Sequence, residues 1–165
     1  MNWEAIDAIA QIVGVIVVVI TLIYLAAQVR QGNQLMRAQA RQRMIEQTER
    51  ELYAQMADPS ITYANVKESP LSEEEQAKLS LFLIAFMRQR EWEWFQFHEG
   101  VINEDIYQTY HGVIAIHLGT HRGRKWWATT GKFAFNSAFV AEVDKLLANS
   151  EPSGYLMGMR TWDDA

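Results

Sequence analysis

Cysteine is absent from this chain of 165 residues, and proline occurs only three times. Without cysteine the protein has no disulfides, no thiolate chemistry and no cysteine metal site, although this absence does not identify its compartment. The first proline is Pro59, so proline interrupts no helix before it. The sequence contains no glycine-rich phosphate loop, nucleophile elbow or paired-carboxylate motif. It therefore predicts no catalytic residue and no cofactor.

Basic residues are missing from the start of the chain. The first 29 residues contain Glu4 and Asp7 but none of the 15 lysines and arginines. The net charge of -5 gives no sign of nucleic-acid binding. Hydrophobic residues make up 49% of the chain and aromatic residues 12%, a composition that favours folded structure over disorder.

A long apolar run lies in this region without basic residues. From Ala8 to Val29 only Gln11, Thr21 and Gln28 are polar, and these 22 residues match the roughly 20 needed to cross about 30 Å of hydrocarbon. A helix buried in a soluble protein would keep a polar side. A cleaved signal peptide would carry a basic start and a small-residue cleavage site, and neither is present. The run predicts a transmembrane helix.

The flanks of this run predict its orientation. Arg30, Arg37, Arg41 and Arg43 follow it with no acidic residue among them, which places the chain after Arg30 in the cytoplasm by the positive-inside rule. In a bacterium the helix would cross the inner membrane, with the N-terminus in the periplasm. Five residues are predicted to mark the membrane boundaries: Trp3, Asp7, Tyr24, Gln28 and Arg30.

Polar residues recur within the run at a spacing of seven. Thr21 and Gln28 lie at multiples of seven from Asp7, which places all three on one helix face. Asp7 and Gln28 are roughly 31 Å apart along a helix, so both reach the headgroups. Gln11 and Thr21 stay inside the membrane, and Gln11 lies close to the small residues Ala10 and Gly14. These four residues, Ala10, Gln11, Gly14 and Thr21, are the predicted helix–helix contact in the membrane.

The remaining chain reads as helical throughout. The fold class predicted is all-α: a transmembrane helix with a short periplasmic tip (1–31), an amphipathic helical stalk (32–57), a helical cytoplasmic domain (58–149) and a loosely ordered tail (150–165). Gly32-Asn33 is the one plausible break before Asp58. The predicted apolar stripe of the stalk consists of Leu35, Ala38, Met44, Ile45, Leu52 and Met56.

Capping residues predict the helix starts in the domain. Ser72 followed by Glu75 forms a capping box for a helix that should stop at Gly100. Within it, residues 79–87 are apolar but too few to span a membrane, which indicates a buried core helix. Asn103 can cap the next helix, and Asn136 or Ser137 starts the last one.

Several stretches together resemble a family of small uncharacterised bacterial membrane proteins. They are NWEAIDAIAQIVG and VVVITLIYLAAQVRQ near the start, LSEEE and EWEWFQFHEGVINED in the middle, and a KWW element before the last helix. The resemblance covers most of residues 2–147. It implies an N-terminal span followed by a helical domain, and it implies no activity.

Two further groups of residues carry alternative interpretations. His117 and His121 are four residues apart and form a weak candidate metal pair, although Gly119-Thr120 should end the helix between them. A second group could contact lipid headgroups or a partner, or could instead comprise one core tryptophan and a solvated turn. It consists of Arg122, Arg124, Lys125, Trp126 and Trp127.

Three functions follow from these predictions. The favoured one is a non-catalytic assembly protein whose partners are the lipid bilayer and either itself or other membrane subunits. The second is a homo-oligomeric pore lined by the polar face of the membrane helix. The third is a membrane-anchored enzyme whose site is assembled from scattered side chains.

Overall fold

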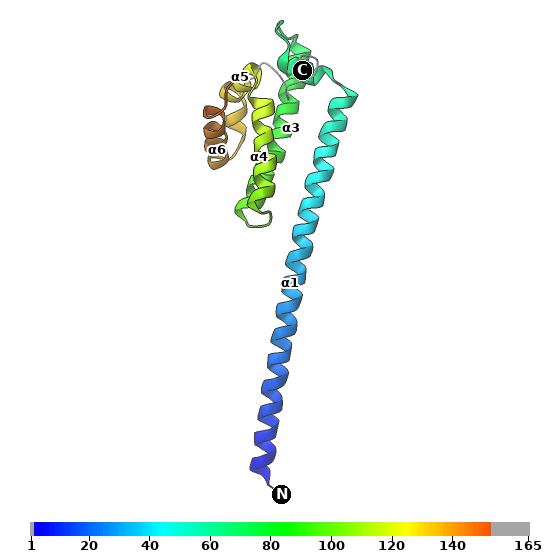
Figure 1. Cartoon of the computed structure of the whole chain (residues 1–165), viewed down its shortest axis with the longest axis vertical. Coiled ribbons are helices and arrows are strands. Elements are labelled where there is room, and N and C mark those ends of the chain that lie inside the picture. Colours follow the sequence, from blue (N-terminus) through cyan, green and yellow to red (C-terminus); the bar gives the residue numbers. More distant parts are fainter. Residues whose placement is uncertain (1, 153–165) are drawn as a thin grey trace, which may run out of the picture. The chain divides into compact units, whose positions relative to one another are not determined.

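The computed structural model describes residues 2–152, and these are helical with no strand among them (Figure 1). The all-α fold class is therefore confirmed. Residues 153–165, which contain most of the predicted tail, lie outside the described part. In chain order the helices are α1 (Trp3–Ala57), α2 (Ser60–Val66), α3 (Glu73–His98), α4 (Glu104–Leu118), α5 (His121–Thr129), the 3-10 helix η1 (Gly131–Ala134) and α6 (Ser137–Ala148).

The first helix is unbroken from Trp3 to Ala57 and passes through Gly32 without interruption. It ends just before Asp58-Pro59, where the proline disfavours helical geometry at the residue that precedes it. Its residues up to Ala40 form one structural unit, and its residues from Arg41 onward belong with the rest of the chain. The two units are described separately below.

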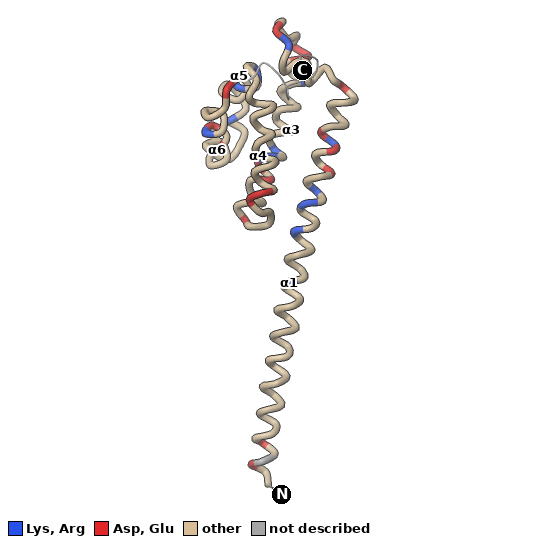
Figure 2. The backbone as a smooth tube through the Cα atoms, viewed as in Figure 1, with Lys and Arg blue, Asp and Glu red and all other residues tan. Residues whose placement is uncertain are grey.

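The N-terminal unit has the composition of a membrane span. Its apolar side chains are exposed, from Ile6 through Val29. Acidic residues occur on α1 only at its start and again in its C-terminal part, where the basic residues also lie (Figure 2). Among the described residues, α1 is the one helix long and apolar enough to cross a membrane by length and composition.

Local capping fixes the helix starts in the second unit. The hydroxyl of Ser72 accepts a hydrogen bond from the amide of Glu75, and the Glu75 carboxylate accepts one from the amide of Ser72, so the predicted capping box is confirmed. Asn103 and Asn136 cap α4 and α6 as predicted. Gly100 ends the turn after α3 with φ of 71°, which glycine adopts without strain.

The core of the second unit forms around α3. This helix packs against α2 and α4, and α4 packs in turn against α5 and α6 (Figure 1). The predicted core segment 79–87 contributes Leu79, Leu83, Phe86 and Met87, although Leu81 within it is 68% exposed. From the other helices, the most deeply buried side chains are Met44, Ile114, Leu118, Phe139 and Val143.

The C-terminal part of α1 packs with a different face from the one predicted. Met44 is fully buried, but Ile45, Leu52 and Met56 of the predicted stripe are exposed. The inward face instead runs through buried Met44 and half-buried Glu51, seven residues apart. A charged residue takes the inward position because it meets a buried partner on α3. The predicted stripe was therefore right at Met44 and wrong at Ile45, Leu52 and Met56.

Candidate functional site

Three of the four predicted membrane contacts, Ala10, Gly14 and Thr21, share one continuous face of α1. Because the helix is unbroken, Asp7, Gly14, Thr21 and Gln28 recur on the same side every seven residues. Ala10, Val17 and Tyr24 follow each of the first three by three residues and complete a seam on that side. We call these seven residues the membrane seam. All of its side chains are exposed.

Polar groups on the membrane seam bond largely within their own helix. The Thr21 hydroxyl donates to the carbonyl of Val17 at 2.8 Å, and the Gln28 amide donates to the Tyr24 hydroxyl at 2.9 Å. Beside the seam, the Gln11 amide bonds to nothing among residues 2–152. The boundary residues Trp3 and Arg30 are exposed.

The two arginines of the predicted lipid or partner group act inside the domain. Arg122 donates to the carbonyls of Ala64 and Ser69 at 2.7 and 2.6 Å, at and beyond the end of α2. Arg124 donates to the carbonyl of Leu147 at 2.8 Å and to that of Ser150, at the end of α6. Both guanidiniums therefore satisfy backbone carbonyls near helix ends. Neither interpretation of the sequence predicted this role.

The other members of the group differ in burial. Trp127 is 2% exposed and donates its indole N–H to Asp144 at 2.7 Å, so one tryptophan is core. Trp126 is half-buried and donates to the Ser80 hydroxyl at 2.9 Å. Lys125 is exposed. Of the predicted contact residues, Lys125 and part of Trp126 thus remain open to solvent.

The two histidines do not share a helix. His117 lies in the last turn of α4, between the rings of Phe82 and Phe86 at centroid distances of 5.4 and 4.4 Å. His121 begins α5 and is exposed. Burial, helped by the nearby charge of Arg90, lowers the pKa of His117 to about 4, so this ring is neutral at neutral pH. Among the described residues no group of three or more metal-ligating side chains is close enough to hold an ion.

A buried charge cluster, which we call the Glu51–Arg90–Glu93 triad, joins α1 to α3. The Arg90 guanidinium lies 3.4 Å from a carboxylate oxygen of Glu51 and 3.2 Å from one of Glu93. The side chains of Arg90 and Glu93 are only 2% and 1% exposed. The rings of Phe86 and Tyr110 also face the guanidinium, at 5.0 and 5.6 Å.

The triad has one carboxylate more than its single guanidinium can neutralise. Burial raises the pKa of Glu93 to about 7, against the lowering effects of Arg90 and of the Gln89 amide. Burial also raises the pKa of Glu51. One carboxylate of the triad can therefore take up a proton near neutral pH. Chemically, the triad can hold α1 against α3 and can titrate.

A second polar cluster centres on Glu142 of α6. Its carboxylate accepts hydrogen bonds from the Tyr107 hydroxyl at 2.6 Å and from the Trp94 indole at 2.7 Å. Burial raises the pKa of Tyr107, and the bond to Glu142 adds to this effect. Because α3, α4 and α6 each contribute one of these residues, the cluster joins three helices.

Sequence reasoning missed both clusters for the same reason. Glu51 and Arg90 are 39 residues apart, and Trp94 and Glu142 are 48 apart. Neither pair has a local spacing that marks it. The available signal was Arg90 and Glu93, two charged residues one turn apart that directly follow an apolar helical segment.

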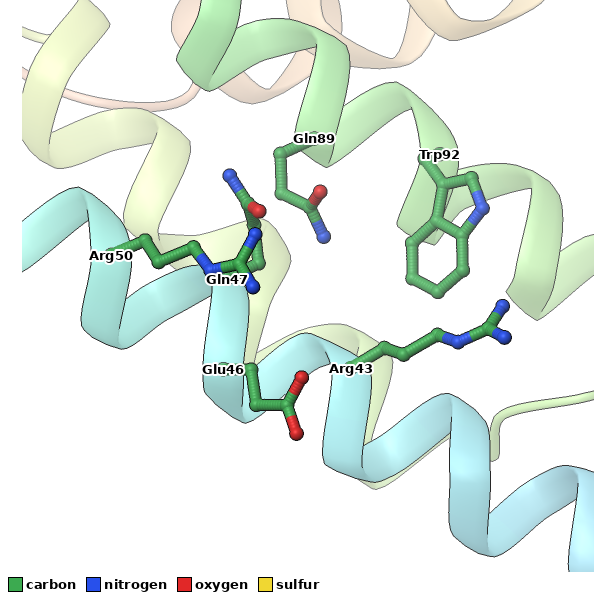
Figure 3. Close-up of a pocket in the computed structure, with 6 residues that line it drawn as sticks. All are labelled: Arg43, Glu46, Gln47, Arg50, Gln89 and Trp92. Carbon is green, nitrogen blue, oxygen red and sulfur yellow. The ribbon is translucent and has the colours of Figure 1, made fainter.

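A pocket opens beside the triad, between α1 and α3. It has a volume of about 360 Å³ and is lined by Arg43, Glu46, Gln47, Arg50, Gln89 and Trp92 (Figure 3). The first four project from α1 and the last two from α3, so two facing helices form its walls. The Gln89 amide donates to Glu93 at 3.1 Å and connects the pocket to the triad.

Comparisons with models of known protein families, with curated proteins and with solved structures find no match to this chain. The resemblance to a family of bacterial membrane proteins therefore stays a prediction, and the geometry above is what bears on function.

Proposed function

We propose that this protein is a single-pass protein of the bacterial inner membrane that acts in assembly and not in catalysis. Its N-terminus would be periplasmic and the domain after Arg30 cytoplasmic. The observation that carries the proposal is the membrane seam, a line of mostly small or polar residues along a helix whose other sides consist mostly of isoleucine, valine and leucine.

Lipid chains would cover the sides formed by isoleucine, valine and leucine. The small and polar residues of the seam offer these chains no comparable apolar contact. In a bilayer, helices associate where small residues let two backbones approach, and Ala10 and Gly14 supply such positions. A Cβ atom built on Gly14 meets nothing within 4 Å, so no packing inside this chain requires glycine there. The partner helix would come from a second copy or from another membrane subunit.

The test uses isoleucine substitutions on two sides of the same helix. Ala10→Ile with Gly14→Ile fills the seam, whereas Ala8→Ile with Ala26→Ile makes the same kind of change on the opposite side. The full chain, extracted in mild detergent, should form a complex by native mass measurement. The seam variant should lose the complex and the control should keep it. A monomeric wild type with no co-purifying subunit, or equal behaviour of both variants, would contradict the proposal.

Orientation can be tested separately because the chain contains no cysteine. Single substitutions Glu4→Cys and Lys132→Cys place one thiol near the start of α1 and one in the helical domain. A maleimide that cannot cross membranes should label Glu4→Cys in spheroplasts and Lys132→Cys only after lysis. The reverse pattern would place the domain outside, and labelling of both in intact spheroplasts would argue against a membrane-spanning helix.

A further inference from the structure

The pocket between α1 and α3 presents two arginines that the fold does not use. Arg43 and Arg50 lie two turns apart on α1, and neither forms a hydrogen bond or ion pair with any residue among 2–152. Four other arginines of this unit, Arg88, Arg90, Arg122 and Arg124, each bind carboxylates or carbonyls. The two pocket arginines are therefore charges available to a ligand.

The remaining lining defines what kind of ligand fits. Glu46 is the one acidic residue of the lining, so with two arginines the lining keeps a net positive charge. The Glu46 carboxylate accepts a hydrogen bond from Gln42 at 2.9 Å. Half-buried Trp92 forms an apolar wall on α3, with the Arg43 side chain extended beneath its ring (Figure 3). Arg50 and Gln47 extend toward Gln89 on the opposite side of the opening.

We propose that this pocket binds the phosphate group of a small organic phosphate. A carboxylate has two oxygens and is satisfied by one guanidinium, whereas a phosphate monoester carries nearly two negative charges and three acceptor oxygens. It can accept hydrogen bonds from Arg43 and Arg50 together when these two exposed side chains, which extend to opposite ends of the opening in Figure 3, turn toward each other. The carboxamides of Gln47 and Gln89 can pair with hydroxyls of the ligand, and the indole of Trp92 covers its carbon skeleton.

The size of the pocket agrees with this ligand class. A volume of about 360 Å³ lies at the lower end of the range for small-molecule sites and exceeds what inorganic phosphate alone would fill. The same phosphate monoester is offered by a soluble sugar phosphate and by phosphatidic acid, an anionic phospholipid whose headgroup is a phosphate monoester. The inference does not depend on the proposed assembly function, since it concerns only residues of the second unit.

The direct test is titration of the full chain in detergent with glycerol 3-phosphate, followed by calorimetry. The variant Arg43→Gln with Arg50→Gln should bind roughly a hundredfold more weakly or worse, because it loses two charge-assisted contacts that each contribute more than a factor of ten. Arg41→Gln is the matched control, since Arg41 has the same charge on the same helix segment but does not line the pocket. Its affinity should equal that of the wild type. Far-UV circular dichroism checks that the variants are folded.

A second readout locates the ligand and its source. The indole N–H resonance of Trp92, identified by its loss in Trp92→Phe, should shift during the titration. Nanodiscs of phosphatidylcholine mixed with phosphatidic acid should weaken this binding, relative to pure phosphatidylcholine, if lipid headgroups occupy the site. Equal binding would indicate a soluble phosphate. Absence of binding in the wild type, or an equal loss in Arg41→Gln, would overturn the proposal.

Discussion

Arg90 and Glu93 form an ion pair inside the helical domain, with Arg90 Nε 3.2 Å from Glu93 Oε2 and almost no contact with solvent. Glu51 adds a second carboxylate to the same guanidinium. A buried pair of this kind contributes little net stability but is costly to break, because the remaining charge has no partner. The triad therefore selects one arrangement of the C-terminal part of α1 against α3.

Glu93 should make the free energy of unfolding fall as pH rises. A mutation of Glu93 can separate this effect from those of other groups that titrate. Its pKa is about 7 in the folded chain, against an ordinary value of 4.5. Between these values the folded chain holds a proton that the unfolded chain has lost, so Glu93 lowers the unfolding free energy as pH rises. His117, with a folded pKa of about 4 and an ordinary value of 6.5, acts in the opposite direction.

The variant Glu93→Gln removes one of these two opposing effects. We expect its unfolding free energy, relative to wild type, to increase by about 1.4 kcal/mol per pH unit between roughly pH 4.5 and 7. Urea unfolding in detergent at several pH values measures this difference. The exposed Glu99→Gln, a matched change directly after α3, should give a pH profile parallel to wild type. A parallel profile for Glu93→Gln would contradict the prediction.

Removing only the cation of the triad should lower the free energy of unfolding more than removing all three charges. Arg90→Met leaves Glu51 and Glu93 buried without their partner, and we expect a loss of about 3 to 5 kcal/mol in the free energy of unfolding. Adding Glu51→Gln and Glu93→Gln to Arg90→Met removes the stranded charges and should recover most of this loss. Urea unfolding of the three proteins measures both steps. No recovery in the triple variant would show that packing of the Arg90 side chain, and not its charge, is what matters.

Helix starts were predictable because their determinants are local. Ser72 and Glu75 are three residues apart, and Asn103 and Asn136 bond to amides within three residues. The roles of Arg122 and Arg124 were not predictable, because most of the carbonyls they bind, including those of Ala64 and Leu147, are between 23 and 58 residues away. A basic cluster beside two tryptophans has the same sequence pattern in both cases, whether its arginines face lipid or bind carbonyls at helix ends elsewhere in the fold. Only the three-dimensional arrangement distinguishes these roles.

The prediction of the inward face in the C-terminal part of α1 failed for the same reason. The contact that orients this face joins Glu51 to Arg90, which lie far apart in the sequence. Apolar periodicity predicted that Ile45, Leu52 and Met56 would face the domain. These three residues are exposed because Glu51 must face Arg90, which turns a different side of the helix inward. A pattern that considers only hydrophobic residues cannot identify a packed face that contains a charge.

Arg124 should stabilise the domain through the end of α6. Arg124→Met keeps much of the side-chain volume but removes the donors to Leu147 and Ser150, and we expect a loss of about 1.5 to 3 kcal/mol in unfolding free energy. Lys125→Met, at an exposed neighbouring position, should change it by no more than about 0.5 kcal/mol. Urea unfolding measures both. Equal losses would indicate that positive charge in this segment, and not capping of α6, is stabilising.

Thr21 separates the assembly and pore interpretations of the membrane seam. Its hydroxyl already donates to the Val17 carbonyl of the same helix at 2.8 Å, so it has no unsatisfied donor to offer to an aqueous axis. Thr21→Val replaces the hydroxyl with a methyl group of nearly the same shape. If the seam packs against another helix, the variant should keep the complex seen by native mass measurement, and ion flux through reconstituted liposomes should be absent in both proteins. Flux in the wild type that disappears with Gln11→Leu and Thr21→Leu would instead establish a conducting role for this face.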